Sequence, residues 1–279
     1  MAEIGKMNTL MVTKTVDFGV YLDGGMLGPI LLPRQSMTGP CIPGREVEVF
    51  LYLDSEDLPI ATMYPPKVKV GECACLRVVD VNRIGAFMDW GLKKDLLVPY
   101  GEQHKPMTVG QSYVVYIYID PASGRITATS KIDKHLPAQS RYFKVQQHED
   151  LLIYAQSKLG YKVIINNVVT GLLFHSEVLT SLKPGQRITG YIKKIRDDNK
   201  IDVTLQRTDR AALEELSVRI LDFLIQSGGY TTLTDKSPPE QIAKQFGVSK
   251  SSYKKALGKL YKQRKIKIDN TQIELVKKQ

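Results

Sequence analysis

The sequence predicts a mostly β protein in which three five-stranded barrels follow one another and an α+β module lies at the C-terminal end. Three observations predict this architecture. Two glycine landmarks recur at matching intervals, short alternating strands are separated by turn residues, and hydrophobic residues take helical spacing only in the last part of the chain. With 279 residues, of which 43% are hydrophobic and 24% charged, the chain has the length for four small modules and a globular composition.

Internal repetition is the first signal in the chain, because a fixed period decides the architecture. One landmark is a glycine that opens an alternating strand, at Gly19, Gly85 and Gly160. The other is a glycine that precedes a strand rich in β-branched residues, at Gly44, Gly110 and Gly185. Both landmarks recur after 66 and then 75 residues. Matching intervals at two landmarks indicate three copies of one unit, which we place at 1–62, 63–135 and 136–210.

Each unit has a pattern of five strands. One strand precedes the first glycine, a second follows it, and a long strand follows the second glycine. Short middle strands are expected at 30–32, 96–98 and 172–174. Closing strands after a turn are expected at 58–62, 124–130 and 200–206. Five strands in about 65 to 70 residues leave no room for crossover helices, which favours a small closed antiparallel barrel of the oligonucleotide-binding (OB) type.

The last segment, 211–279, begins with two predicted helices. The first is indicated by helical spacing of Leu213, Leu216, Ile220, Leu221, Leu224 and Ile225. It ends at the pair Gly228 and Gly229, since glycine commonly terminates helices. Ser237, followed by two prolines and Glu240, predicts a capping-box start for a second helix, which stops at Gly247.

A third helix and a hairpin complete this segment. Ser249 can cap a helix that continues to about Gln263. Short strands are expected at Leu233, 265–268 and 272–276. The order helix, helix, turn, helix and hairpin predicts a winged-helix domain at 211–279.

Positive charge increases along the chain. Lys and Arg outnumber Asp and Glu by 39 to 29, for a net charge of +10 and an isoelectric point near 9.3. The four predicted modules carry net charges of −4, +3, +5 and +6 in chain order. Because a positive field attracts polyanions, the sequence favours a nucleic acid partner that contacts the C-terminal half.

The second unit resembles the S1 RNA-binding domain family through residues 71–79, 84–91 and 96–99, and 171–177 in the third unit matches the last part of the same pattern. S1 domains offer bases an aromatic residue shortly after the glycine. That position holds Tyr21 and Phe87 in the first two units but Lys162 in the third. The resemblance implies S1-like OB barrels that bind RNA, with the acidic first unit as a degenerate copy.

Over essentially the whole chain, the combination of three S1-like barrels with this tail resembles the conserved virulence factor B family of bacteria. The residues that carry the resemblance are 190–196, 235–237, 249–250 and 254–262. The resemblance implies an RNA-binding regulatory protein of the bacterial cytoplasm. It also favours the third barrel and the winged helix as the contact surface.

Candidate RNA-binding residues fall into two groups. Candidate stacking residues are Phe87, Trp90, Tyr161 and Phe174. Core packing is the alternative for each, because a shift of one residue in strand phase reverses its face. Candidate phosphate contacts are Lys158, Lys162, Lys193, Lys194, Arg196, Lys250, Lys254, Lys255, Lys259, Lys262 and Arg264. A third helix that offers lysine and almost no Asn, Gln or Arg favours phosphate binding over base readout. A solvated helix face is the alternative.

Catalysis is not expected. The chain has no phosphate-binding loop motif, no clustered carboxylates for two metals, and no nucleophile with a base at a suitable spacing. Cys73 and Cys75 have no further ligands at a zinc-binding spacing, and three cysteines imply no disulfide framework. We therefore expect no catalytic residue, no metal and no cofactor.

The cellular location and the oligomeric state are predicted from features that the sequence does not contain. No stretch reaches 18 apolar residues and the first residues have no secretory pattern, so a cytoplasmic protein with no membrane contact is expected. No coiled coil is visible, which favours a monomer. The expected function is binding of single-stranded RNA, as mRNA, in post-transcriptional regulation. The alternatives are a winged-helix DNA-binding transcriptional regulator and a factor associated with the ribosome or translation.

Overall fold

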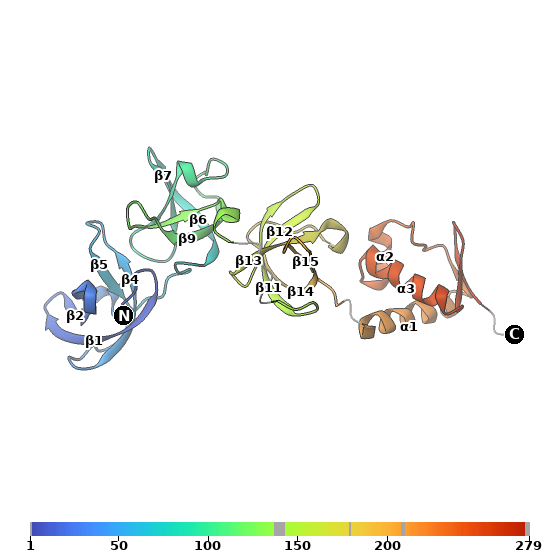
Figure 1. Ribbon diagram of the computed structural model, residues 1–279, viewed down its shortest axis with the longest axis horizontal. Coiled ribbons are helices and arrows are strands. Elements are labelled where there is room, and N and C mark those ends of the chain that lie inside the picture. Colours follow the sequence, from blue (N-terminus) through green and yellow to red (C-terminus); the bar gives the residue numbers. More distant parts are fainter. Residues whose placement is uncertain (1, 137–142, 179, 208–209, 277–279) are drawn as a thin grey trace. The chain divides into compact units, whose positions relative to one another are not determined.

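The computed structural model describes residues 2–136, 143–178, 180–207 and 210–276 (Figure 1). The chain divides into two compact units, 1–136 and 137–279. The first unit contains two five-stranded barrels, and the second contains a third barrel and a domain of three helices with a small sheet. The predicted fold class, three tandem barrels followed by a winged helix, is therefore confirmed.

Barrel 1 is closed, with the strand order β1-β2-β3-β5-β4. Its strands are β1 (Met7–Val16), β2 (Gly19–Asp23), β3 (Pro29–Pro33), β4 (Glu46–Leu53) and β5 (Pro59–Thr62). All pairs are antiparallel except β3 with β5. Alternate residues of β2 and β3 point inward, so that Leu22, Ile30 and Leu32 are fully buried in its core.

Barrel 2 has the strand order β10-β9-β6-β7-β8, and its two edge strands, β8 and β10, contact each other. Its strands are β6 (Cys73–Asn82), β7 (Gly85–Asp89), β8 (Leu96–Pro99), β9 (Ser112–Ile119) and β10 (Ile126–Thr129). Barrel 3 is closed in the same order as barrel 1. Its strands are β11 (His148–Gln156), β12 (Gly160–Ile165), β13 (Val169–Phe174), β14 (Arg187–Ile195) and β15 (Ile201–Thr204). The expected middle and closing strands are found in all three units.

The first glycine landmark has a steric reason. Gly19, Gly85 and Gly160 each open the second strand of a barrel, where the backbone of the third strand passes very close. A Cβ atom there would lie 2.2, 2.3 and 2.1 Å from the carbonyl oxygens of Leu32, Val98 and Leu173 respectively. Because that oxygen belongs to the paired strand, no side chain fits without opening the barrel.

The second landmark has a conformational reason. Gly44, Gly110 and Gly185 have φ angles of +83°, +84° and +91°, in the region that favours glycine. Each donates its N–H to a carbonyl of the first strand, at 2.8 Å in all three barrels. The repeat in the sequence is therefore a repeat of two backbone constraints.

The hydrophobic core of barrel 2 is shared with barrel 1, which also has a core of its own. Phe50 and Tyr52 of β4 belong to the cluster that contains Trp90, Met88 and Val98 of barrel 2. The Phe50 ring meets Trp90 edge-on, with ring centroids 5.8 Å apart. Such a shared core binds the two barrels into one packed body.

The C-terminal domain has the winged-helix order α1 (Arg210–Gln226), β16 (Tyr230–Thr231), α2 (Pro239–Phe246), α3 (Lys250–Lys262), β17 (Ile266–Ile268) and β18 (Ile273–Leu275). Its sheet has the order β16-β18-β17. The apolar faces of the helices meet around Tyr253 and Leu260, both fully buried. The predicted cap of α3 is confirmed, since Ser249 Oγ accepts from the Ser252 amide at 3.2 Å.

Two local predictions in this domain were wrong. Ser237 does not cap α2, because its hydroxyl accepts from the Thr234 amide at 2.9 Å and Pro238 occupies the cap position. The strand expected at Leu233 lies earlier, at Tyr230–Thr231, because the chain turns directly after Gly229 to pair with β18. In both cases the hydrogen bonding and geometry of the local turn decided the structure, and the sequence pattern did not predict it.

Candidate nucleic-acid interface

The outward face of the second and third strands is equivalent in the three barrels. The residue two positions after the landmark glycine is outward-facing and half-buried in each: Tyr21, Phe87 and Lys162. Their cross-strand partners are Leu31, Leu97 and Leu172. The alignment of these positions in the sequence is therefore borne out by register, and barrel 3 replaces an aromatic residue with a cation.

Two of the four predicted stacking residues are buried. Trp90 is 3% exposed, and its indole N–H donates to the Lys94 carbonyl at 2.6 Å. Tyr161 is 5% exposed, and its hydroxyl accepts from the Leu182 amide at 3.2 Å. Both rings pack in barrel cores. A stacking role needs an exposed ring face, so burial corrects these two assignments in favour of core packing.

Phe87 and Phe174 are half-buried and remain candidates. Phe87 lines a cleft in the first unit together with Leu97. The guanidinium carbon of Arg196 lies 5.7 Å from the centroid of the Phe174 ring. One face of Phe174 is therefore covered by a cation, an arrangement that favours cation–π packing.

Some predicted phosphate contacts of barrel 3 are engaged within the protein. Lys193 pairs at 2.6 Å with Glu177, which is 2% exposed and also accepts from Thr204 Oγ1 at 2.9 Å. Arg196 Nε donates to both oxygens of Asp202, at 2.9 and 3.0 Å. These hydrogen bonds raise the pKa of Arg196 above its usual range. Both cations hold the barrel together, which lowers their availability for phosphate.

The other cations of barrel 3 are more accessible. Lys158 and Lys194 are exposed. Lys162 Nζ lies 5.8 Å from the centroid of the Tyr154 ring and is half-buried. His175, next to Phe174, is exposed and contacts the segment that carries Lys158, since its Nε2 lies 3.1 Å from the Ser157 carbonyl.

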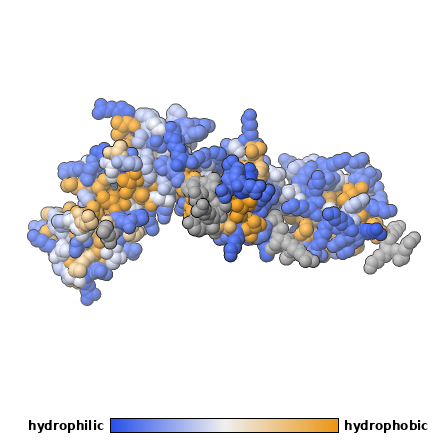
Figure 2. Space-filling view, viewed as in Figure 1, coloured by the Kyte–Doolittle hydropathy of each residue, from blue (hydrophilic) through white to orange (hydrophobic). Residues whose placement is uncertain are grey.

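The cations of the winged helix divide in the same way. Lys259 pairs with Glu214, and Lys250 Nζ donates to the Ser237 carbonyl at 3.0 Å. Lys254 lies 3.8 Å from Asp235, but its side chain is 70% exposed. The remaining predicted cations, Lys255, Lys262 and Arg264, are exposed. On the visible face of this domain, hydrophilic side chains predominate (Figure 2).

A side chain that the sequence analysis missed links barrel 3 to the turn before α3. Gln206 Nε2 donates to the Gly247 carbonyl at 3.0 Å, and its Oε1 accepts from the Ser249 amide at 3.1 Å. The short helix η5 (His175–Glu177) of barrel 3 also contacts α3. The exposed end of barrel 3 and the N-terminal end of α3 therefore form one surface within the second unit.

Arg219 is a second residue that sequence reasoning missed. Its Nη2 donates to the Phe246 carbonyl at 2.7 Å, at the turn between α2 and α3. With Arg207 and Lys255 it lines a cleft of about 340 Å³ beside Gln206. The sequence offered no signal for this residue, because an isolated arginine within a helical segment matches no motif and the turn it contacts comes beside it only in the fold.

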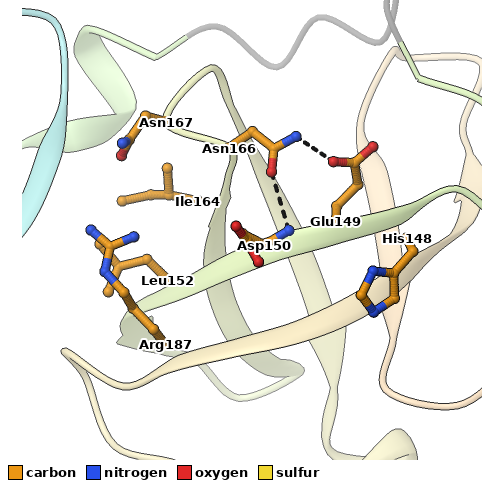
Figure 3. Close-up of a pocket in the computed structure, with 8 residues that line it drawn as sticks. All are labelled: His148, Glu149, Asp150, Leu152, Ile164, Asn166, Asn167 and Arg187. Atoms are coloured by element: carbon orange, nitrogen blue, oxygen red, sulfur yellow. Dashed lines mark hydrogen bonds between the residues drawn. The ribbon is translucent and has the colours of Figure 1, made fainter.

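Barrel 3 also has a polar pocket of about 520 Å³ (Figure 3). Asn166 Oδ1 accepts from the Asp150 amide at 3.1 Å, and its amide donates to Glu149, which is 6% exposed. The lining holds two carboxylates and one arginine, Arg187, so it lacks the cationic excess of a phosphate site. Among the described residues, no group of three or more His, Cys, Asp or Glu side chains could hold a metal ion.

Membrane insertion through a helix finds no support in the part of the chain that the structure describes. None of its helices combines the length and the apolar character needed to cross a bilayer.

Comparison with known families identifies both module types. The S1 domain model matches residues 4–64 and 70–131, and the CvfB-like winged helix domain model matches 218–275. Both are nucleic-acid-binding types. These matches, together with the basic surface, indicate that the chain binds nucleic acid.

Relatives match over nearly the full length. "Uncharacterized protein YitL" of Bacillus subtilis is 30% identical, over 95% of this chain and 91% of its own. "Conserved virulence factor B" of Staphylococcus aureus is 26% identical, over 84% of this chain and 81% of its own. A crystal structure of a multidomain protein with nucleic acid binding domains from Streptococcus pneumoniae is 24% identical, covers 98% of both chains and has a TM-score of 0.42.

Proposed function

Because this chain belongs to the conserved virulence factor B family, we propose that it is an RNA-binding regulatory protein that acts on single-stranded RNA with low sequence specificity. In this proposal the S1-like barrels stack bases and the basic winged helix holds phosphates. The physiological target is mRNA in the bacterial cytoplasm, the regulation is post-transcriptional, and the protein works as a monomer without a cofactor.

The observation that carries the proposal is the continuous surface of the second unit. Gln206 joins barrel 3 to the turn that starts α3, and exposed cations lie on both sides of this junction. They include Lys158 of barrel 3 and Lys255 of α3. A strand that follows this surface meets phosphate contacts from both domains, which is the arrangement of an electrostatic track for single strands.

The composition of α3 supports phosphate binding rather than base readout. The helix Lys250–Lys262 contains no Asn, Gln or Arg, which are the side chains that bond base edges bidentately. Lysine contacts fix position along a strand but carry little sequence information. Low specificity is therefore expected, in contrast to a regulator that reads a duplex groove.

The test is fluorescence anisotropy with three labelled probes: single-stranded RNA, single-stranded DNA of the same sequence, and duplex DNA, each at several salt concentrations. We expect the tightest binding to RNA, for purine and pyrimidine runs alike, with affinity that falls as salt rises. A clear preference for duplex DNA refutes the proposal and favours a winged-helix transcriptional regulator. Preference for structured ribosomal RNA over single strands favours a translation-associated factor.

A charge-reversal variant locates the contact. Lys254, Lys255 and Lys262 are replaced together by Glu, because all three are exposed, whereas Lys259 is paired with Glu214. If each contacts one phosphate, the slope of log affinity against log salt becomes shallower by about 2, since each contact on a single strand contributes about 0.7. The matched control reverses Lys14, Lys93 and Lys105, three exposed lysines of the first unit. An unchanged slope in the α3 variant excludes this helix from the interface.

A further inference from the structure

The first unit contains a cleft of about 320 Å³ that neither barrel forms alone. Tyr52 and Leu53, at the end of β4 in barrel 1, line one side. Phe87 of β7 and Leu97 of β8 line the other side, on the outward face of barrel 2. The end of β4 of barrel 1 therefore lies beside the outward face of β7 and β8 in barrel 2. In barrel 3, the equivalent face carries Lys162 in place of Phe87.

The walls of the cleft are mostly apolar. Ile84, which is 52% exposed, and the half-buried Phe87 and Leu97 present hydrophobic surface to it. Trp90, the single tryptophan of the chain, also lines the cleft, but it is 3% exposed, so that it reports on the cleft and does not itself stack on a ligand. A slot with apolar and aromatic walls suits a flat aromatic ring, because stacking and burial of apolar surface both favour it.

The cations at the cleft are already paired. Arg125 Nε donates to Asp57 Oδ2 at 3.0 Å, and Lys94 Nζ lies 3.5 Å from Asp57 Oδ1. These contacts hold the pKa of Asp57 below its usual range, with the Arg125 hydrogen bond as the main cause. Because Asp57 of the acidic hairpin and Asp95, which also lines the cleft, offset the charges of Arg125 and Lys94, the cleft has little net charge to attract phosphate. An uncharged ring is the better occupant.

The wall that barrel 1 supplies is fixed in place. Tyr52 is 6% exposed and lies in the core shared by the two barrels, with Phe50 packed between it and Trp90. A wall anchored in a shared core keeps its position before a ligand arrives, which reduces the entropic cost of binding.

We propose that this cleft between barrels 1 and 2 binds one unpaired nucleobase of RNA, with barrel 1 supplying the second wall. The acidic first barrel thus contributes to RNA binding through the half-buried Leu53, which follows the buried Tyr52, rather than through a positive surface. This inference rests on the proposed RNA-binding function. It assigns to the first unit a base site, whereas the phosphate contacts lie in the second unit.

Trp90 fluorescence tests the inference in the full-length protein. Labelled oligouridylate and oligoadenylate are titrated, with anisotropy of the label as the measure of total RNA binding and Trp90 emission as the measure of cleft occupancy. We expect the emission to change with the same midpoint as the anisotropy. If the anisotropy shows RNA binding but the Trp90 emission does not change, the proposed base site in the cleft is refuted and the proposed RNA-binding function still stands. Absence of RNA binding in both signals refutes both.

Leu53→Glu places a carboxylate in the cleft and is expected to abolish the Trp90 response. The matched control is Leu58→Glu, in the same hairpin, where the side chain is 57% exposed and does not line the cleft. The control is expected to respond like the parent protein. A full response from Leu53→Glu overturns the inference.

A change in Trp90 emission before RNA is added would show that Leu53→Glu alters the packing of the cleft. In that case Phe87→Ala tests whether the cleft binds a base. Loss of one stacking ring is expected to weaken the Trp90-detected binding roughly tenfold, within the range measured for base–aromatic stacking. Equal affinity in Phe87→Ala and the parent protein overturns the inference. The urea midpoint of each variant, measured without RNA, shows that the barrels remain folded.

Discussion

The shared core of the first unit predicts that barrels 1 and 2 unfold together, and Phe50→Ala tests this. Phe50 is fully buried, meets Trp90 edge-on and stacks near Tyr52 at a centroid distance of 6.5 Å. Removal of a buried phenylalanine ring costs about 4 kcal/mol, from lost burial and the cavity left behind. With a urea m-value of about 2 kcal/mol/M, the unfolding midpoint falls by about 2 M.

Trp90 fluorescence during urea unfolding is the assay, because the single tryptophan lies in barrel 2 while the substitution lies in barrel 1. The matched control is Phe18→Ala, a phenylalanine of barrel 1 that is 58% exposed, which is expected to change stability by less than about 0.5 kcal/mol. A Trp90 midpoint that stays unchanged in Phe50→Ala would refute the coupling. The barrels would then be separate folding units despite their contact.

Three further predictions concern single contacts. Gln206→Ala removes the bonds to Gly247 and Ser249 and is expected to lower RNA affinity about fivefold in anisotropy, with the melting temperature nearly unchanged. Equal affinity would contradict the inference that Gln206 holds barrel 3 and α3 together as one RNA-binding surface. Glu177→Gln breaks the pair with Lys193 and is expected to lower the free energy of unfolding by about 2 kcal/mol, less than for a fully buried pair because Lys193 is 26% exposed. Calorimetry measures this loss, and Lys193→Met, which removes the other partner, serves as the comparison. Burial is the main cause that lowers the pKa of His135 below 6.5, so the unfolded chain takes up the proton first as pH falls. Stability of the first unit therefore decreases below about pH 6.5, and His135→Gln should flatten this dependence in urea titrations.

The fold could be predicted from the sequence because its signals are local. A glycine that faces a neighbouring backbone, as at Gly85, or that holds a positive φ, as at Gly110, leaves a mark at one position. Three barrels repeat these marks at fixed intervals. Helical spacing and the Ser249 cap likewise lie within a few residues of each other, and the winged helix followed from them.

Other local signals were ambiguous. Ser237 precedes two prolines and Glu240, a pattern that fits a capping box, yet its hydroxyl serves the turn at Thr234 instead. Several backbone amides can donate to the same hydroxyl, and the packing of the turn decides which of them does.

The site depended on contacts that the sequence does not display. Trp90 follows the S1 strand pattern, but it is buried because Phe50, 40 positions earlier, closes over it. Lys193 and Lys255 look alike as basic residues, yet Glu177 neutralises one of them and the other stays exposed. The sequence by itself determined that this protein is basic, through its composition, and that it consists of barrels and a winged helix, through its repeated glycines and local patterns. The tertiary structure decided which cations are free and which rings are covered, because pairing and burial depend on residues that only folding brings together.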